Sequence, residues 1–341
     1  MSVDRVVVIG ASAGGVAPLE SLVSALPADF PAAILIVLHV APTQKSLLPG
    51  ILSRAGSLPA VSATDRAPLR RGHIHVAVAD HHLLVEQDRL RVTRGPKENH
   101  FRPSIDVLFR SAAYHFGARA IGVVMSGALY DGSSGLFAIK RLGGVAVIQD
   151  PDEALYTSMP LSALKHVDID YALPAADIAA LLSGLMQQPA RKEPLDAAQY
   201  RKDLKAEIDV AAADSAFERG IMECAQPSTY TCPECNGVLF RIEEGKTDRF
   251  RCHTGHGFTT AALLDGYSVS VEATLWEAVK SLQETIALLT ETDQRLRRNG
   301  DDAAANAVHR QAAEVEAHLD TLRTIALEHA GLNRAAEAEQ P

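Results

Sequence analysis

Ser12 lies in a turn whose composition suits a catalytic nucleophile. The residues from Arg5 to Gly15 read RVVVIGASAGG, so a run of β-branched residues ends in a turn of glycine, alanine and serine. A helical pattern follows, and the segment therefore predicts a strand, a tight turn and a helix. The turn has the G-x-S-x-G spacing of a nucleophile elbow, in which small neighbours let a substrate approach the serine hydroxyl. Free N–H groups at the start of the helix point to where an oxyanion would form.

The same turn permits two other interpretations. Glycine-rich turns after a first strand also bind dinucleotide phosphates, but Ser12 stands where the second glycine of G-x-G-x-x-G is required. The next predicted strand, Ala32 to Leu38, ends in His39 rather than in the acidic residue that binds a ribose. The remaining alternative is a glycine turn with a serine of no catalytic role. The choice therefore depends on whether Ser12 has catalytic partners.

A serine nucleophile needs a base and a group that orients the base. His39 directly follows the predicted strand 32–38, and Asp131 follows the predicted strand 120–125 after a short turn. Because the carboxyl ends of parallel strands meet at one edge of a sheet, Ser12, His39 and Asp131 are predicted to converge there. As alternatives, His39 is a loop or core histidine and Asp131 is a helix N-cap, which is a common use of aspartate.

Three cysteines and a histidine have the spacing of a metal site. Cys232 and Cys235 form a C-x-x-C pair, Cys252 follows 17 positions later, and His256 stands four residues beyond Cys252. This Cys₃His set predicts a structural zinc ion, which a small module without a core needs in order to fold. The alternatives are reduced cysteines without metal, and His253 as the fourth ligand.

Other residues with ligand or thiol chemistry support weaker hypotheses. His73, His75, His81 and His82 are close in sequence, but they define no closed ligand set, so metal binding there is the less favoured interpretation. Cys224 is predicted to be a free thiol.

Length and composition favour a cytoplasmic globular protein of about two domains. The 341 residues are 47% hydrophobic and 22% charged, which is ordinary for a globular chain. The sequence shows no secretory signal, no apolar stretch of transmembrane length and no disulfide framework. The formal net charge of −9 argues against nucleic acid or an anionic membrane as the main partner.

The first 186 residues alternate short apolar strands with amphipathic helices. This order predicts an α/β fold with a doubly wound, mostly parallel, Rossmann-like sheet that helices cover on both faces. The predicted strands are residues 6–9, 32–38, 74–78, 83–85, 90–92, 120–125 and 145–148, and the predicted helices are residues 16–23, 46–54, 104–116, 133–141 and 175–186.

The rest of the chain changes character after residue 187. We expect a catalytic domain, a linker that contains a helix near 197–204, a zinc-binding module and a helical hairpin, over residues 1–188, 189–228, 229–265 and 266–335 respectively. Leucines repeat every seven residues in the last part, and Asn299-Gly300-Asp301 separates its two helices. A hairpin within one chain is favoured over a dimeric coiled coil because few heptads are sustained.

Five segments occur in an order that is typical of one protein family. They are VIGASAGG near the N-terminus, LHVAP around His39, RPSIDVLFRSAA from Arg102, SGALYDGSSGL from Ser126 and QDPDEALYTSMPLSAL from Gln149. Over about residues 3–186 the chain resembles the catalytic domain of CheB-type chemotaxis protein-glutamate methylesterases. The resemblance implies a Ser–His–Asp triad at Ser12, His39 and Asp131. It also implies hydrolysis of glutamyl methyl esters on chemoreceptors, often with deamidation of receptor glutamines.

The chain departs from the family pattern in three ways. The resembling domain begins at residue 3, so we expect a member without the N-terminal receiver. Ala128 stands where the family often has a methionine associated with the oxyanion site, and Ala13 stands where a hydroxyl residue is common. The backbone N–H groups of Ala13 and Ala128 remain the oxyanion candidates. The cysteine module and the helix after it resemble C-terminal extensions of receiver-free members.

Two functions from different classes follow. The leading one is a methylesterase that needs no cofactor for catalysis and acts on a methylated chemoreceptor or a similar signalling protein, with no nucleic acid and no membrane insertion. Its C-terminal third would contribute no catalytic group, so an isolated domain over Val3–Met186 would stay active. The alternative is a non-catalytic signalling adaptor that retains the fold and uses the C-terminal hairpin as its partner surface. A dehydrogenase is less favoured, because Pro160 stands where a lysine is needed four residues after Tyr156.

Overall fold

The structure is a computed structural model of the whole chain, and it describes residues 3–43, 46–212, 225–245 and 247–338. The chain divides into two compact units, Met1–Leu263 and Leu264–Pro341. Each unit is described by itself. Cys224 lies outside the described residues.

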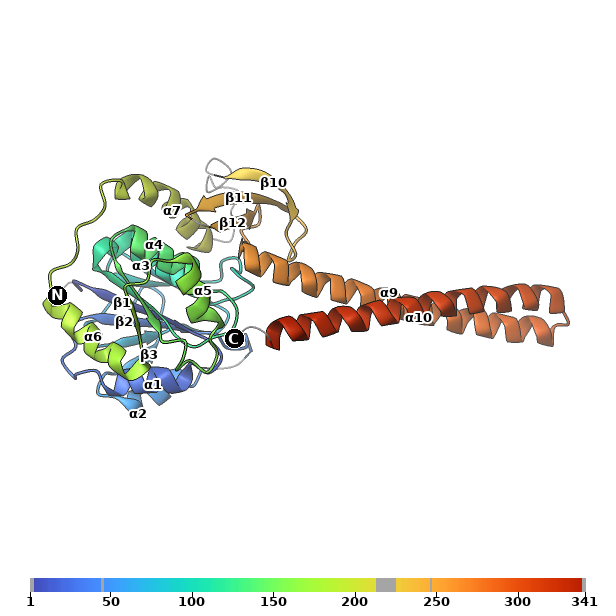
Figure 1. Cartoon of the computed structure of the whole chain (residues 1–341), viewed down its shortest axis with the longest axis horizontal. Coiled ribbons are helices and arrows are strands. Elements are labelled where there is room, and N and C mark those ends of the chain that lie inside the picture. Colours follow the sequence, from blue (N-terminus) through green and yellow to red (C-terminus); the bar gives the residue numbers. More distant parts are fainter. Residues whose placement is uncertain (1–2, 44–45, 213–224, 246, 339–341) are drawn as a thin grey trace. The chain divides into compact units, whose positions relative to one another are not determined.

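A seven-stranded parallel sheet forms the centre of the first unit (Figure 1). Its strand order is β3-β4-β2-β1-β7-β8-β9, so β2, β3 and β4 lie on one side of β1 and β7, β8 and β9 lie on the other. The strands are β1 (Val6–Ala11), β2 (Ala33–Leu38), β3 (Ala60–Ser62), β4 (Ile74–Val76), β7 (Ala120–Val124), β8 (Val145–Gln149) and β9 (Tyr171–Leu173). The strand order reverses beside β1, and such a position places a crevice at the carboxyl ends of β1 and its neighbours.

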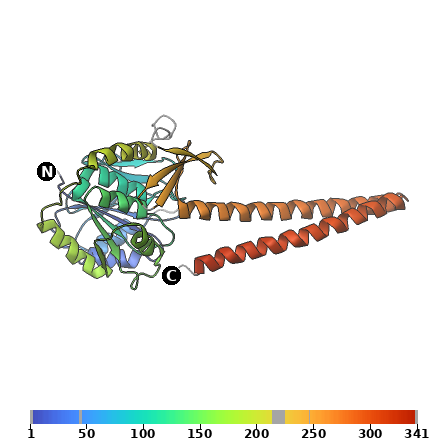
Figure 2. The same cartoon turned by 45° about the horizontal axis from the view of Figure 1, so that its top comes forward.

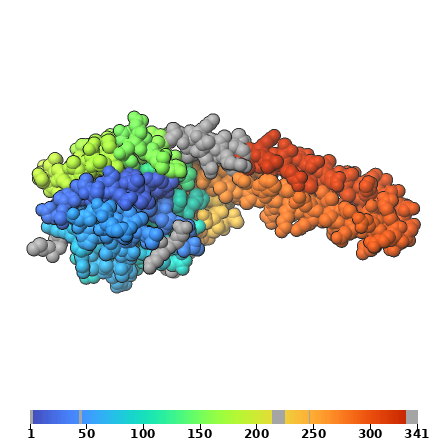
Figure 3. Space-filling model, turned by 90° about the horizontal axis from the view of Figure 1, so that it is seen from below, coloured from blue at the N-terminus to red at the C-terminus, as the bar shows by residue number. Residues whose placement is uncertain are grey.

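Helices cover both faces of this sheet, as the sequence predicted (Figures 1 and 2). One face carries α1 (Val16–Ser24), α2 (Leu48–Ala55) and α6 (Ala175–Gln187), and the other carries α3 (Ile105–Phe116), α4 (Ser133–Arg141) and α5 (Ser158–His166). Alternate strand residues point to opposite faces. Val7 and Ile9 therefore pack under α1, whereas Val6 and Val8 pack under α3. Because both faces are buried, the strands are apolar throughout rather than alternating. The surfaces of α1 and α6 lie side by side in the space-filling view (Figure 3).

A hairpin and a further helix extend the second face. Strands β5 (His82–Glu86) and β6 (Arg89–Thr93) form an antiparallel pair that packs on α3. Helix α7 (Ala197–Ala212) packs across this pair and α3, with its Leu204 and Val210 buried. The helix expected near 197–204 thus continues to Ala212, because its second half also carries an apolar face. Residues within the expected linker therefore belong to the packed unit.

The cysteine-bearing segment forms a small four-stranded antiparallel sheet. Its strands are β10 (Gln226–Thr231), β11 (Val238–Glu244), β12 (Thr247–Cys252) and β13 (Gly257–Thr259). We call residues 226–259 the cysteine module. A parallel bridge joins Gly257 of β13 to Glu98, which lies in the segment before α3. The cysteine module is therefore part of the same compact unit as the parallel sheet.

The second unit holds most of a helical hairpin. Helix α9 (Thr260–Arg298) starts at the end of the first unit and α10 (Asp302–Ala338) follows after a turn, so the predicted hairpin is confirmed. Gly300 adopts a φ of 79° in the turn, and Asp301 accepts a hydrogen bond from the Ala304 N–H (3.1 Å) as an N-cap. Four buried residues of α10 repeat every seven positions, namely Ala305, Ala312, Leu319 and Ala326, and Ala330 is buried one turn further on. Within the described ranges, no helix has an apolar run long enough to cross a bilayer.

Candidate active site

Ser12, His39 and Asp131 follow three neighbouring strands of the parallel sheet. Ser12 comes directly after β1, His39 directly after β2, and Asp131 seven residues after the end of β7. The His39 N–H donates to the Ala11 carbonyl (3.2 Å), and the Ser12 N–H donates to the Ser126 carbonyl (3.0 Å). These backbone bonds continue the strand pairing beyond the sheet and hold the three segments at one edge.

The turn that carries Ser12 packs closely against the loop after β7. A Cβ atom at Gly127 would lie 2.9 Å from the Ser12 Cβ, and one at Gly14 would lie 2.9 Å from the Ser126 Oγ. Gly14 also has a φ of 69°, which favours glycine. The Ser126 hydroxyl donates to the Ala13 carbonyl (2.9 Å) and so ties the two loops together. The small residues of the turn are therefore required by close packing around Ser12.

His39 and Asp131 form a buried pair. The His39 Nε2 lies 2.9 Å from the Asp131 Oδ2, and the two side chains are 6% and 0% exposed. The Phe101 ring stacks on the imidazole, with centroids 3.8 Å apart and planes inclined by 10°. Among the described residues, the other ring nitrogen, Nδ1, has no hydrogen-bond partner although it is buried. The imidazole is thus fixed on one side and has a nitrogen available for a proton on the other.

Asp131 is held as a carboxylate by several donors. Besides His39, they are the Asn99 Nδ2 (3.1 Å), the Ser104 Oγ (2.9 Å), the Ile105 N–H (2.6 Å) and the Asp106 N–H (3.3 Å). The two backbone donors belong to the first turn of α3, whose dipole favours an anion. Burial acts to raise the pKa of Asp131, but the hydrogen bonds from His39, Ile105 and Asn99 bring it below its ordinary value. The ionised form is the one that can stabilise a protonated imidazole.

Asp106, which lies on α3, accepts hydrogen bonds from backbone N–H groups at the start of α4, just as Asp131 does at the start of α3. Its Oδ1 accepts from the N–H groups of Gly132 (3.0 Å) and Gly135 (2.6 Å), and its Oδ2 accepts from the Asn99 Nδ2 (2.8 Å). Burial and then the charge of Asp131 raise the pKa of Asp106 well above its ordinary value. Asp131 therefore caps α3 and Asp106 caps α4. The N-cap alternative for Asp131 holds for α3 and not for α4, which follows it in the chain.

The oxyanion candidates lie in the two loops that pack together at Ser12. Ala13 and Ala128 are both partly exposed, and neither N–H donates to an acceptor among the described residues. Their assignment as the oxyanion site stays a prediction.

The sequence did not predict the roles of Asn99 and Phe101, which a two-residue turn places next to the His39–Asp131 pair. The N–H and carbonyl groups of Glu98 and Phe101 pair with each other (3.1 and 2.9 Å), and the two residues between them have positive φ, 50° at Asn99 and 70° at His100. These are the backbone conformations of a type I′ turn. The Asn-His dipeptide just ahead of the RPSIDVLF segment was the available signal, since asparagine is common at such positions.

The histidines between residues 73 and 82 belong to no metal-binding group in the described part of the chain. His82 instead supports the site. Its Nε2 donates to the Pro96 carbonyl (2.8 Å), and its Nδ1 accepts from the Ser104 N–H (3.2 Å). Burial lowers the pKa of His82 to about 4, so the ring is neutral at neutral pH and positions Ser104.

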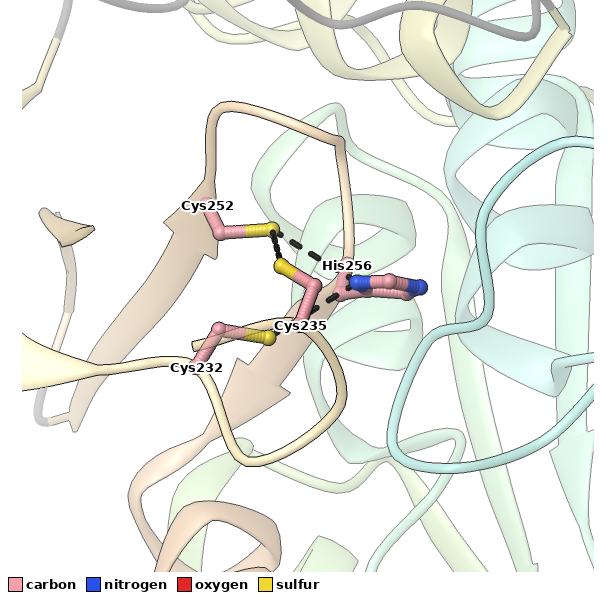
Figure 4. A group of neighbouring side chains, drawn as sticks. All are labelled: Cys232, Cys235, Cys252 and His256. Atoms are coloured by element: carbon pink, nitrogen blue, oxygen red, sulfur yellow. Dashed lines mark hydrogen bonds between the residues drawn. The ribbon is translucent and has the colours of Figure 1, made fainter. Parts of the chain in front are cut away.

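Cys232, Cys235, Cys252 and His256 converge in the cysteine module (Figure 4). Their ligand atoms all lie within 4.8 Å of one another. The Cys252 Sγ is 3.6 Å from both the Cys235 Sγ and the His256 Nδ1, and the Cys232 Sγ is 3.7 Å from that nitrogen. Tetrahedral zinc with Zn–S bonds of about 2.3 Å separates its sulfurs by about 3.8 Å. The four residues therefore fit a metal ion, and His256 rather than His253 completes the set.

Comparison with known proteins agrees with this architecture. Residues 7–182 match the family model described as CheB methylesterase, and the chain belongs to this family. It is 37% identical over 182 residues to a putative protein-glutamate methylesterase/protein-glutamine glutaminase of Leptospira interrogans, which covers 53% of this chain and 94% of that protein. It is 38% identical over 185 residues to protein-glutamate methylesterase/protein-glutamine glutaminase 1 of Bordetella avium, which covers 54% of each. The chain thus spans about half of the latter relative.

A solved structure is similar over the same region. The CheB methylesterase catalytic domain of Thermotoga maritima is 30% identical, with a TM-score of 0.51, and the match covers 53% of this chain and 98% of that one. The Rossmann-like class predicted for the first part of the chain is confirmed.

Proposed function

We propose that this protein is a serine hydrolase that cleaves glutamyl methyl esters on chemoreceptor-type proteins and deamidates receptor glutamines. One observation carries the proposal: a buried His39–Asp131 pair, whose second ring nitrogen has no partner in the described part of the chain, at the sheet edge that also bears Ser12. The names of the relatives, which include both activities, supply the substrate class.

Ser12, His39 and Asp131 can carry the whole reaction. The Ser12 Oγ attacks the ester carbonyl while the His39 Nδ1 takes its proton. The N–H groups of Ala13 and Ala128 would bind the oxyanion of the tetrahedral intermediate. Its collapse breaks the C–O bond, and protonated His39 returns the proton to the leaving methoxide, which departs as methanol. Water then attacks the acyl-enzyme with His39 as base, and the products are a glutamate side chain and free Ser12. With a glutamine substrate, ammonia leaves in place of methanol.

The adaptor alternative is less favoured by the same geometry. A binding protein has no use for a buried imidazole whose free nitrogen lacks a partner, because an unsatisfied buried polar atom costs stability.

The proposed ester hydrolysis needs no cofactor. A methylated chemoreceptor or similar signalling protein remains the proposed partner, and the hairpin of α9 and α10 remains a candidate partner surface. The expected division of the chain at residues 188, 228 and 265 likewise stays a prediction.

The activity is tested with the whole chain and two receptor substrates. We expect methanol release from a methylated receptor, ammonia release from a receptor with glutamine at the same positions, and labelling of Ser12 by a fluorophosphonate. Labelling should require His39, so His39→Ala should abolish it. Absence of both products together with labelling that ignores His39 would favour the adaptor.

We also propose that the Cys₃His set holds one structural zinc ion. Four protein ligands close the coordination sphere, which leaves no position for a reacting water. Freshly purified, reduced protein should contain about one zinc per chain, and Cys252→Ser should lose it. Thr254→Ala is the matched control, because the Thr254 hydroxyl contacts the Cys235 Sγ (3.4 Å) without belonging to the ligand set. Equal zinc contents in the wild type and Cys252→Ser would contradict the site.

A further inference from the structure

The cysteine module is joined to the active site through the turn of Asn99. The Asn99 N–H donates to the Gly257 carbonyl (2.8 Å), and the Gly257 N–H donates to the Lys97 carbonyl (3.2 Å). Gly257 directly follows His256, one of the four proposed metal ligands. The backbone beside the metal site is therefore paired with the backbone that enters the catalytic turn.

The Asn99 side chain continues this connection to the catalytic acid. Its Oδ1 accepts from the Thr259 N–H of β13 (2.9 Å). Its Nδ2 donates to the Asp131 Oδ1 (3.1 Å) and to the Asp106 Oδ2 (2.8 Å). The residue is 3% exposed, so water does not replace these bonds. One amide group thus spans the distance between the cysteine module and Asp131.

Buried ion pairs also hold Glu98, the residue before Asn99, in place. The two carboxylate oxygens of Glu98 bind Arg110 of α3 and Arg251 of β12, and the Arg251 guanidinium also donates to the Gly255 carbonyl in the loop between Cys252 and His256 (2.8 Å). Burial acts to raise the pKa of Glu98, but the surrounding arginines bring it well below its ordinary value. Breaking such a buried pair leaves an uncompensated charge, which is strongly unfavourable.

The other turn residue makes a third connection. The His100 ring contacts the Glu234 carboxylate (3.1 Å) and the Ala262 carbonyl (2.9 Å). Glu234 lies between Cys232 and Cys235 in the C-x-x-C loop. Because Asn99 and His100 both hold a left-handed backbone, their conformation costs free energy that these contacts offset.

We propose that Asn99 is a positioning residue through which the metal-bound cysteine module holds Asp131 and His39 in their reactive arrangement. This rests on the proposed function, because it assumes that the pair acts as base and acid for Ser12. When metal is lost, the small module loses its fold. The turn then loses its β13 partners, Asn99 no longer aligns Asp131, and Phe101 no longer fixes the His39 ring. The catalytic rate therefore depends on the module, so an isolated domain over Val3–Met186, which the sequence alone predicted to stay active, should lose activity.

The first test removes the amide and keeps the backbone conformation. Asn99→Gly tolerates the positive φ and deletes all three side-chain bonds. We expect kcat to fall by about 10–100-fold with KM changed less than about twofold, because a small misplacement of catalytic groups lowers kcat rather than binding. Gln87→Gly is the matched control: Gln87 also has a positive φ (57°), lies exposed in the β5–β6 turn, and should leave kcat unchanged. Wild-type kcat in folded Asn99→Gly would overturn the role of Asn99.

The second test uses the unmodified whole chain and a zinc chelator. Hydrogen–deuterium exchange should rise in residues 97–103 together with 226–259, and fluorophosphonate labelling of Ser12 should slow by about tenfold or more. In Asn99→Gly the same chelation should slow labelling by a smaller factor, because that connection is already cut. Faster exchange in 226–259 with unchanged exchange in 97–103 would overturn the coupling. If the wild type does not label at all, the proposed function fails, while the exchange of residues 97–103 still decides the coupling.

Discussion

Ser12→Ala should reduce methanol release from a methylated receptor by about 10⁴–10⁶-fold and leave the fold intact, since loss of a triad nucleophile has effects of that order. Alanine keeps the Cβ atom that packs beside Gly127 and removes only the hydroxyl. No hydrogen bond of that hydroxyl contributes to the packing of the described residues, so the free energy of unfolding should change by less than about 0.5 kcal/mol. The measurements are kcat/KM for methanol release and the thermal unfolding midpoint.

A second serine distinguishes loss of the nucleophile from a general effect of the substitution. Ser183 lies partly buried on α6, where its hydroxyl donates to the Ala179 carbonyl (2.9 Å). Ser183→Ala should retain full methanol release. If Ser12→Ala kept as much as a tenth of the wild-type rate, another residue would have to be the nucleophile.

Asp131→Asn should lower kcat by about 10³–10⁴-fold and, unlike Ser12→Ala, should also destabilise the protein. An asparagine presents an NH₂ group where one carboxylate oxygen now accepts hydrogen bonds. Either the Oδ1 donors Asn99 and Ser104 or the Oδ2 donors His39 and Ile105 then lose their acceptor. Each buried donor left without an acceptor costs about 1–3 kcal/mol. Steady-state kinetics and chemical denaturation measure the two effects separately.

Asp131 should also affect how the stability of the protein depends on pH. The pKa of Asp131 is lower in the folded protein than in the unfolded chain, so its ionised form stabilises the fold above the unfolded pKa of about 3.9. That contribution disappears as the pH falls through the lower folded pKa, and Asp131→Asn should lose this part of the acid dependence.

Asp170→Asn is the control for the effect on kcat. Asp170 also accepts a backbone N–H, from Ala146 (2.9 Å), but it lies at the β8–β9 side of the sheet. A fall in kcat of equal size in Asp170→Asn would contradict a catalytic role for Asp131.

The parallel sheet was predictable because its strands are buried on both faces. Continuous apolar runs marked β1, β2, β7 and β8, and the predicted helix 133–141 has the bounds of α4. The hairpin was predicted from residue 266, whereas α9 begins six residues earlier, at Thr260, ahead of the leucine repeat. The strands of the cysteine module were not predicted. Most residues of β10 are exposed and polar, so burial imposed no hydrophobic pattern there.

The positions of the proposed triad were predictable, but the contacts that fix them were not. Parallel strands end at one edge, which is enough to bring Ser12, His39 and Asp131 together. Sequence pattern contains no information on which helix Asp131 would cap, or that a turn of positive φ would bring Asn99 beneath it. Those contacts join segments that are 25 to 160 residues apart, and only tertiary packing decides them.

The exchange of caps between Asp106 and Asp131 affects how related sequences should be interpreted. Each carboxyl closes the first turn of the other's helix, so either aspartate would be kept for folding even in a chain that had stopped turning over substrate. An aspartate at position 131 is accordingly weak evidence that a relative is an active enzyme. The Ser12 hydroxyl, by contrast, has no such role in the packing of the described residues. A lineage that drifted into a scaffolding role should lose that hydroxyl first and the aspartate last, and a survey for inactive relatives should begin at the serine.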